Sequence, residues 1–314
     1  MKKFKKVSAI ITTHNRIELL KKAIASVEKQ TYKNMEIIVV DDCSTDGTRD
    51  YCLNNGRIKY IQITKEKHKN GNYARNLGII NSSGYYVAFL DDDDEWYDTK
   101  IEKQVQFLEE NTNFELVSCL RKKVINNTFI SYDAKKNNET SKYERQVFYE
   151  IIGTTSTYLA TKKSVMNIGM FDENLNAWQD VEFITNMATH YKIGILNEHL
   201  TLYRRNLSDK KRISNGNIDK WLDAVKYINE KYKENIKKLP SEEKQKRELF
   251  ILCDMASRYQ KLGNKNKKKE CLKTCFYKNK TFKNFIKYFF NVTYDDIAVL
   301  KLKLNRFLKQ GSRS

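Results

Sequence analysis

The chain has 314 residues, of which 40% are hydrophobic and 31% are charged, so there is room for one large domain with an appendage or for two domains. Its net charge of +19 is unevenly placed: residues 201–314 hold 30 Lys and Arg against 12 Asp and Glu, whereas residues 1–200 hold 28 against 27. No apolar run approaches the roughly 18–20 residues of a membrane span, and no cysteines form a Cys-x-x-Cys pair. We therefore expect a soluble or peripheral cytoplasmic protein with reduced thiols.

Residues 1–120 alternate between apolar strand-like runs and amphipathic helical segments. Strands are expected at residues 7–12, 36–40, 58–63 and 87–90, and helices around residues 19–27, from residue 70 onward and at 100–110. Strand–helix alternation of this kind predicts an α/β fold with a mainly parallel sheet and helices on both faces.

The pattern becomes mixed after residue 117 and helical after residue 218. Short strands are expected at residues 117–120, 155–160 and 193–196, with a helix at 181–190. Residues 206–217 are polar and basic and predict a flexible loop, and residues 218–309 read as helices. We expect a catalytic domain over residues 1–205 and a basic helical region over residues 206–314.

Four consecutive carboxylates, Asp91–Asp94, follow the apolar run Val87–Leu90. Because aspartate is depleted in strands and repels its own kind, this run must lie where the strand ends. In open parallel sheets, ligands bind outside that end of the strands. Carboxylates gathered there can hold Mg²⁺ or Mn²⁺, and the cation can bind a diphosphate. A solvated acidic turn is the alternative.

Several ordered motifs over about 95 residues resemble family-2 glycosyltransferases. They are Val7–Arg16 (VSAIITTHNR), Ser26-x3-Gln30-Thr31-Tyr32, Glu36–Val40 followed by Asp41-Asp42-x-Ser44-Thr45-Asp46-Gly47-Thr48, Ala74-Arg75-Asn76-x-Gly78, and Phe89-Leu90-Asp91-x-Asp93-Asp94. The resemblance covers roughly residues 5–205. It implies the nucleotide-diphospho-sugar-binding fold called GT-A and an inverting mechanism.

The resemblance also implies roles for individual residues. Thr12, His14 and Asn15 belong to the loop that contacts the nucleotide, with histidine standing where many members have a base-stacking tyrosine. Asp42 matches the residue that hydrogen-bonds uracil, and Arg75 a basic residue near the base and phosphates. Asp93 and Asp91 match the metal-binding Asp-x-Asp motif, and Asp92 would lie near the ribose. A turn or cap role for Asp42 is the alternative.

Asp180 lies in the sequence Trp178-Gln179-Asp180-Val181-Glu182, just before an apolar helix. An inverting transfer needs one carboxylate to take the proton of the acceptor hydroxyl. Asp180 aligns with the family's base, so the resemblance assigns it that role. A helix N-cap is the alternative for Asp180, Glu182 is the fallback base, and Trp178 would either stack on a sugar or pack in the core.

The basic last third matches no catalytic motif. The resemblance to enzymes that extend lipid-linked glycans suggests a peripheral membrane contact through residues 279–314, where phenylalanines alternate with lysines. Packing against the catalytic domain or in a homo-oligomer is the alternative. The aromatic residues gather on one face rather than spacing out as stacking platforms, which argues against nucleic acid as the partner.

The sequence thus predicts a Mn²⁺- or Mg²⁺-dependent glycosyltransferase with a nucleotide-sugar donor, expected to be a UDP-sugar, and a glycan or lipid-linked glycan acceptor at the inner face of a bacterial membrane. A sugar-nucleotide-forming nucleotidyltransferase is one alternative, but the loop after the first strand lacks a glycine-rich phosphate motif. The others are a nucleic-acid- or membrane-binding protein that acts through the tail and a non-catalytic scaffold.

Overall fold

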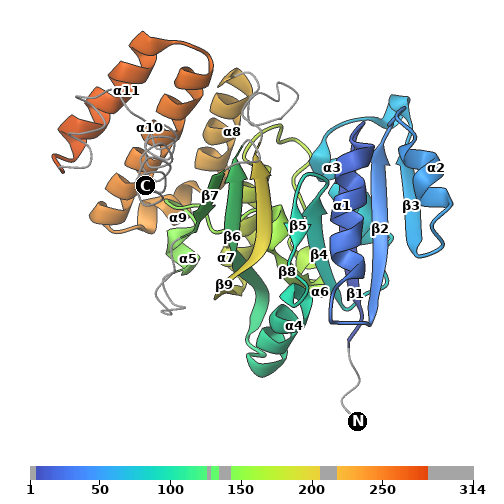
Figure 1. Cartoon of the computed structure of the whole chain (residues 1–314). Coiled ribbons are helices and arrows are strands. Elements are labelled where there is room, and N and C mark those ends of the chain that lie inside the picture. Colours follow the sequence, from blue (N-terminus) through green and yellow to red (C-terminus); the bar gives the residue numbers. More distant parts are fainter. Residues whose placement is uncertain (1–4, 126–128, 134–142, 206–217, 282–314) are drawn as a thin grey trace, which may run out of the picture. The chain divides into compact units, whose positions relative to one another are not determined.

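The computed structural model of the protein describes residues 5–125, 129–133, 143–205 and 218–281. The chain divides into two compact units (Figure 1). The first contains the residues up to Val147 and Ile151–Leu207, and the second contains Phe148–Glu150 and the segment from Ser208 onward.

The first half of the sheet in the first unit is parallel. Its strands are β1 (Val7–Thr13), β2 (Met35–Asp42), β3 (Ile58–Ile63) and β4 (Tyr86–Asp91), in the spatial order β3-β2-β1-β4. The segments between them contain α1 (Ile17–Glu28), α2 (Thr48–Leu53), the 3-10 turn η1 (Lys65–Lys67) and α3 (Gly71–Ile80). The chain adds β2 and β3 on one side of β1 and β4 on the other, so the strand order reverses at β1. Open α/β sheets bind ligands at such a switch point.

Helices cover both faces of this parallel half. Successive side chains of a strand point to opposite faces. On one face, Ala9 and Ile11 share a buried core with Leu20 and Ile24 of α1. On the other face, α3 approaches so closely that a Cβ on Gly78 would lie 2.4 Å from Ile10 Cγ2. The prediction of an α/β fold with helices on both faces is confirmed.

The second half makes the sheet mixed. It contains β5 (Glu95–Trp96), β6 (Phe114–Ile125), β7 (Phe129–Tyr132), β8 (Leu159–Thr161) and β9 (Lys192–Arg205). The described strands form one nine-stranded sheet in which β4–β8, β6–β8, β6–β7 and β5–β9 are antiparallel and β6–β9 is parallel. The helical segments here are α4 (Lys100–Glu110), α5 (Tyr143–Gln146), η3 (Thr155–Thr157), α6 (Lys162–Asn167) and α7 (Gln179–His190).

The strand expected at residues 155–160 is only partly correct. Thr155–Thr157 forms the 3-10 turn η3, and strand β8 begins at Leu159. The Thr157 hydroxyl accepts from the Thr154 amide at 3.1 Å and donates to the Thr154 carbonyl at 2.7 Å, which holds η3 in its turn. Side-chain hydroxyls that bond to nearby backbone compete with a strand ladder, which the apolar pattern did not indicate.

The second unit is helical in its described residues. It contains α8 (Ile218–Lys231), α9 (Lys233–Lys238), α10 (Ser241–Lys261) and α11 (Lys265–Lys278), and α10 and α11 pack side by side (Figure 1). Trp221 is fully buried beneath the Arg258 guanidinium, at 5.0 Å from its ring. Buried Arg247 bonds to the Phe148 carbonyl and to Asn229, so the short segment Phe148–Glu150 belongs to this unit.

None of the helices in the described ranges is long and apolar enough to cross a membrane. The loop predicted at residues 206–217 and the aromatic and basic segment from residue 282 to the end lie outside the described residues.

Candidate functional site

The predicted site residues gather where the parallel strands end. In the sheet register, Thr12 of β1 is opposite Val40 of β2 and Asp91 of β4, and Thr13 is opposite Asp41. Asp42 is the last residue of β2 and Asp91 the last residue of β4, and the loops that follow β1 and β4 carry His14 and Asn15 and the rest of the aspartate run. Residues from three separate parts of the sequence therefore meet at one edge of the sheet.

Asp91 is held by partners from two other segments. Arg75 of α3 donates to Asp91 Oδ1 at 2.7 Å, and the Thr155 hydroxyl of η3 donates to Asp91 Oδ2 at 3.0 Å. The Asp91 amide donates to Ser156 Oγ at 3.1 Å. The side chain keeps 32% exposure, so its position is fixed while one side still faces solvent.

Asp92 and Asp94 are buried, unlike Asp91. Asp92 accepts from the Thr13 hydroxyl at 2.8 Å and from Arg16 at 3.2 Å. Burial raises the pKa of Asp92 to about 6. Asp94 is 1% exposed, and burial together with the charges of Asp93 and Asp91 raises its pKa well above the ordinary value. Its Oδ1 accepts from the Arg204 amide at 3.1 Å, whereas its buried Oδ2 has no hydrogen-bond partner among the described residues.

This donor set fits a hard divalent cation held by few protein ligands. Burial is the main cause of the raised pKa values of Asp92 and Asp94, and one buried oxygen of Asp94 has no hydrogen-bond partner among the described residues, so a cation there would stabilise carboxylates that the fold removes from water. Asp93 has a side-chain exposure of 14% and lies 3.5 Å from Arg16. The four aspartates do not form a group of three converging ligands in the described part of the chain. Mg²⁺ and Mn²⁺ sites of nucleotide enzymes commonly use one or two carboxylates plus the phosphates.

His14, Asn15 and Asp42 lie together at the ends of β1 and β2. The His14 ring bonds through Nδ1 to the Asp42 carbonyl, and the Asn15 side chain lies 3.2 Å from His14 Nε2. Asn15 adopts a left-handed φ of 51° and accepts from the Thr45 amide, which joins the two loops. The Asp42 carboxylate instead contacts His68 Nδ1 at 2.8 Å.

Asp180 stands in the first turn of α7, beside the aspartate run. Helix α7 begins at Gln179, and Trp178 occupies the N-cap position with a left-handed φ of 52°, so Asp180 is not the N-cap. Burial raises the pKa of Asp180 and the charge of Asp91 raises it further, while Arg75 and Arg121 lower it. Arg75 also donates to Gln179 Oε1 at 3.2 Å, so one guanidinium joins the end of β4 to the start of α7.

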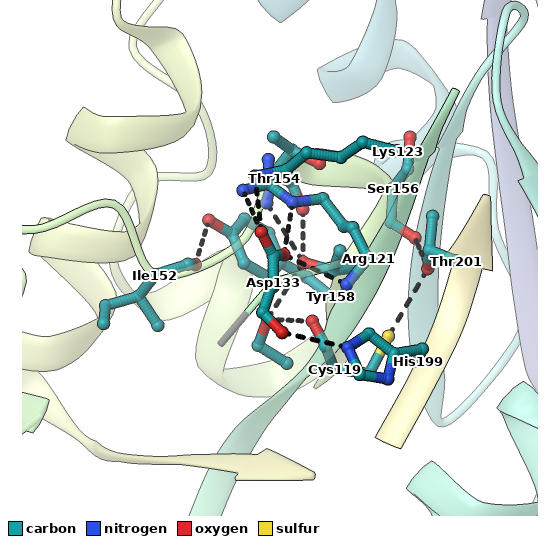
Figure 2. A network of polar contacts seen from close by, with 12 residues as sticks. Cys119, Arg121, Lys123, Asp133, Ile152, Thr154, Ser156, Tyr158, His199 and Thr201 are labelled. Atoms are coloured by element: carbon teal, nitrogen blue, oxygen red, sulfur yellow. Dashed lines mark hydrogen bonds and ion pairs between the residues drawn. The ribbon is translucent and has the colours of Figure 1, made fainter. Parts of the chain in front are cut away.

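A polar network that includes residues of β6 and β9 contains Arg121, whose charge acts on Asp180 (Figure 2). Arg121 makes two hydrogen bonds to the Asp133 carboxylate, at 2.8 and 3.3 Å (Figure 2). Arg121 lies 5.4 Å from the Tyr203 ring centroid, and the Tyr158 hydroxyl donates to the Ile152 carbonyl. Burial raises the pKa of Tyr158, and the charge of Asp180 raises it further.

Several residues of this region were not predicted as site residues. They are Arg16, His68, Arg121, Thr155 and Ser156. Arg16 stands inside a quoted motif, yet only the fold brings its side chain to Asp92 and Asp93. The others have no motif of their own and lie far in sequence from the residues they contact. Trp178, which was expected either in a sugar-binding wall or in the core, is buried.

Comparison with known proteins identifies the protein family to which this chain belongs. The family "Glycosyl transferase family 2" matches residues 8–169, which is slightly more than half of the chain. The chain belongs to this family, and the resemblance predicted from its motifs is confirmed.

Particular relatives and structures agree with this membership. An uncharacterized glycosyltransferase of Rickettsia felis is 35% identical over 237 residues, or 71% of this chain and 35% of that protein. The GalNAc(5)-diNAcBac-PP-undecaprenol beta-1,3-glucosyltransferase of Campylobacter jejuni is 34% identical over 191 residues, or 59% of this chain and 58% of that protein. This chain therefore spans about a third to three fifths of the length of these relatives.

Among solved structures, residues 1–349 of S. aureus TarS in complex with UDP-GlcNAc match with a TM-score of 0.56 at 17% identity, over 88% of this chain and 93% of that one. At this identity the likeness concerns the fold, and it confirms the predicted GT-A fold followed by C-terminal helices.

Proposed function

We propose that this protein is an inverting, divalent-metal-dependent glycosyltransferase that moves a sugar from a UDP-sugar to a hydroxyl of a lipid-linked or cell-surface glycan. Residues 1–205 would form the catalytic domain. The observation that carries the proposal is the Arg75 guanidinium, which bonds to Asp91 at the end of β4 and to Gln179 beside Asp180. This contact supports a site in which the proposed metal-binding motif and the proposed base lie at the same edge of the sheet.

The donor would bind across the ends of β1, β2 and β4. His14 and Asn15 would contact the base and Asp42 would hydrogen-bond its ring, with Thr12 beside them and Asp92 near the ribose. Asp93 and Asp91 would hold Mn²⁺ or Mg²⁺, which when bound would offset charge on the leaving diphosphate. Arg75 and Arg16 would add fixed positive charge at the same place.

Asp180 would act as the general base. Its carboxylate would take the acceptor hydroxyl proton as that oxygen bonds to the anomeric carbon, while the bond from this carbon to the diphosphate oxygen breaks on the opposite face. Arg75 and Arg121 lower the pKa of Asp180 against the effect of burial and so favour the ionised form that a base requires.

A lipid-linked acceptor is supported by two observations. The Campylobacter relative is named for an undecaprenol-diphosphate substrate, and the last third of this chain is strongly basic. We propose that this region contacts the anionic inner face of the cell membrane. A homo-oligomer remains the alternative use of these helices.

The test is nucleotide release from UDP-, GDP- and dTDP-sugars with Mn²⁺ or with EDTA. Slow release of UDP from one donor that EDTA stops would support the proposal. Release of pyrophosphate from a sugar phosphate and a nucleoside triphosphate would instead show the nucleotidyltransferase.

A further inference from the structure

A second group of ligand-type side chains lies at the end of β2, and the proposed reaction does not use all of it. Asp42, Cys43 and His68 each offer a ligand atom, and these atoms lie within 4.8 Å of one another. In the described ranges this is the one such three-residue group of His, Cys, Asp or Glu. Unlike the aspartate run, it combines a carboxylate, a thiol and an imidazole.

The three residues come from two segments that the fold brings together. Asp42 is the last residue of β2 and Cys43 follows it with a left-handed φ of 55°. His68 lies 25 residues further on, directly after η1, and its Nδ1 is 2.8 Å from Asp42 Oδ1. Left-handed backbone is uncommon for a residue other than glycine, and here it belongs to the residue that carries the thiol.

The side chains of this group are exposed enough for an ion to reach them from solvent. The side chain of Asp42 is 14% exposed and that of His68 is 48% exposed. An ion can therefore reach the group from solvent past His68, while the carboxylate below is shielded enough to strengthen its attraction for a cation.

We propose that Asp42, Cys43 and His68 bind a borderline-soft divalent cation of the Zn²⁺ class, at a site separate from Asp91 and Asp93. Zn²⁺ accepts carboxylate oxygen, imidazole nitrogen and thiolate sulfur, and three protein ligands leave its fourth position open. Mg²⁺ and Mn²⁺ prefer oxygen ligands, so the two sites would select different ions.

The protons and charges of this binding step balance. The Cys43 thiol gives its proton to solvent, and the thiolate and the Asp42 carboxylate together neutralise the 2+ charge. In the described contact His68 donates its Nδ1 proton to the Asp42 carboxylate. When the cation takes Nδ1, that proton leaves to solvent and the neutral ring carries its one proton on Nε2. Burial raises the pKa of Cys43 and the charges of Asp42 and Asp41 raise it further, so the thiol stays protonated until a cation displaces the proton.

Occupancy would also affect the nucleotide. Asp42 is the residue proposed to hydrogen-bond the base, and His14 bonds to the Asp42 carbonyl with its ring 6.4 Å from that of His68. A cation on Asp42 would therefore compete with the nucleotide base for the Asp42 carboxylate. This consequence rests on the proposed function, whereas the cation site itself does not.

The direct test is titration of the full-length protein, without a histidine tag and after chelator treatment, with Co²⁺ as the spectroscopic probe. We expect a near-ultraviolet cobalt–thiolate band that saturates at one equivalent and disappears on addition of Zn²⁺. Cys43→Asn, whose new residue suits a left-handed backbone, should abolish the band. His68→Gln should weaken Co²⁺ binding at least about tenfold.

The matched control concerns the second unit, where Cys253 Sγ and Cys275 Sγ lie 3.8 Å apart and could also bind a soft cation. Cys253→Ser should leave the band unchanged. A band that survives Cys43→Asn, a band lost in Cys253→Ser, or no band at stoichiometric Co²⁺ would overturn the proposal. Unchanged thermal unfolding of each variant shows that folding is not the cause.

A second measurement separates the cation site from the proposed function. With Mn²⁺ held constant, Zn²⁺ should weaken UDP binding at least tenfold in the unmodified protein and have no effect in Cys43→Asn. The expected cobalt band together with unchanged UDP binding would support the cation site. That result would contradict the proposed hydrogen bond between Asp42 and the nucleotide base.

Discussion

At the scale of single residues, the proposed chemistry separates leaving-group stabilisation by the aspartate run from base catalysis by Asp180. The isosteric change Asp180→Asn removes the base and leaves the contacts of Arg75 with Asp91 and Gln179 in place. We expect kcat to fall by about 10²–10⁴-fold, which is typical for loss of a general base. Single-turnover assays measure the rate of transfer, and calorimetry measures the affinity for UDP.

UDP affinity should stay within about twofold in that variant. Full transfer activity in Asp180→Asn would show that another residue acts as the general base, and Glu182 would be the next residue to test. Loss of UDP binding along with transfer would show a structural role instead.

Glu36 shows a residue-scale effect on stability, at the edge of the sheet opposite the site. Burial raises the pKa of Glu36, but hydrogen bonds from Ser8, Ser83 and Lys6 outweigh it and lower the pKa to about 2. Between pH 2 and about 4.5 the unfolded chain binds more protons than the folded one, so this stabilisation is complete above pH 4.5 and is lost as the pH falls toward 2.

Glu36→Gln should therefore lower the free energy of unfolding by about 1–2 kcal/mol at pH 7, allowing for solvent screening. Urea unfolding of both proteins at several pH values measures the difference. The two stabilities should converge toward pH 2, and a difference that does not change between pH 7 and pH 3 would contradict the assigned pKa.

At the scale of elements, the approach of α3 to the sheet depends on a residue without a side chain. A Cβ on Gly78 would lie 2.4 Å from Ile10 Cγ2 and 3.3 Å from Val40 Cγ2. Gly78→Ala should destabilise the protein by about 1–3 kcal/mol, because overpacking outweighs the gain of about 0.5–1 kcal/mol in helix propensity.

The matched control is Gly56→Ala, since nothing lies within 4 Å of a Cβ at Gly56. Its effect should stay within about 0.5 kcal/mol. Equal urea midpoints for the two variants would show that α3 does not pack as closely as described.

The elements also show what sequence reasoning could reach. Strands β1 to β4 were predicted within a residue or two. For β1, β2 and β4 this is because buried parallel strands are near-continuous apolar runs. The start of α3 was predicted at residue 70, where the Asn70 side chain caps the helix. Strand β9 extends to Arg205, well past the expected Leu196, because its second half carries polar residues that pair with β5 and β6. The local sequence pattern does not predict such long-range strand pairing.

The same limit applies to the site. Asp42, Arg75 and Asp91 stand in motifs and could be named from the sequence, and the fold brings them to one edge of the sheet. The contacts of Arg16 with Asp92 and of Thr155 with Asp91 join residues 76 and 64 positions apart. No spacing rule links them, so they emerge only from the fold.

At the scale of the whole molecule, charge separates the two parts of the sequence. Residues 201–314 carry nearly all the excess positive charge. If this region contacts membranes, the full chain should sediment with vesicles that contain anionic lipid, and binding should fall steeply from 50 to 500 mM salt. Deletion of residues 279–314 should weaken this sedimentation. Unchanged sedimentation of the shortened chain would show that residues 279–314 are not needed for membrane binding.

The central claim is that a divalent cation at the aspartate run holds the donor's diphosphate. It is tested most directly by calorimetry of UDP and of uridine, each with Mn²⁺ and with EDTA, because uridine has the base and lacks the phosphates. We predict that EDTA weakens UDP binding at least tenfold and leaves uridine unchanged, and that Asp93→Asn with Mn²⁺ behaves like the unmodified protein in EDTA. UDP binding that is equally tight with EDTA would contradict the claim.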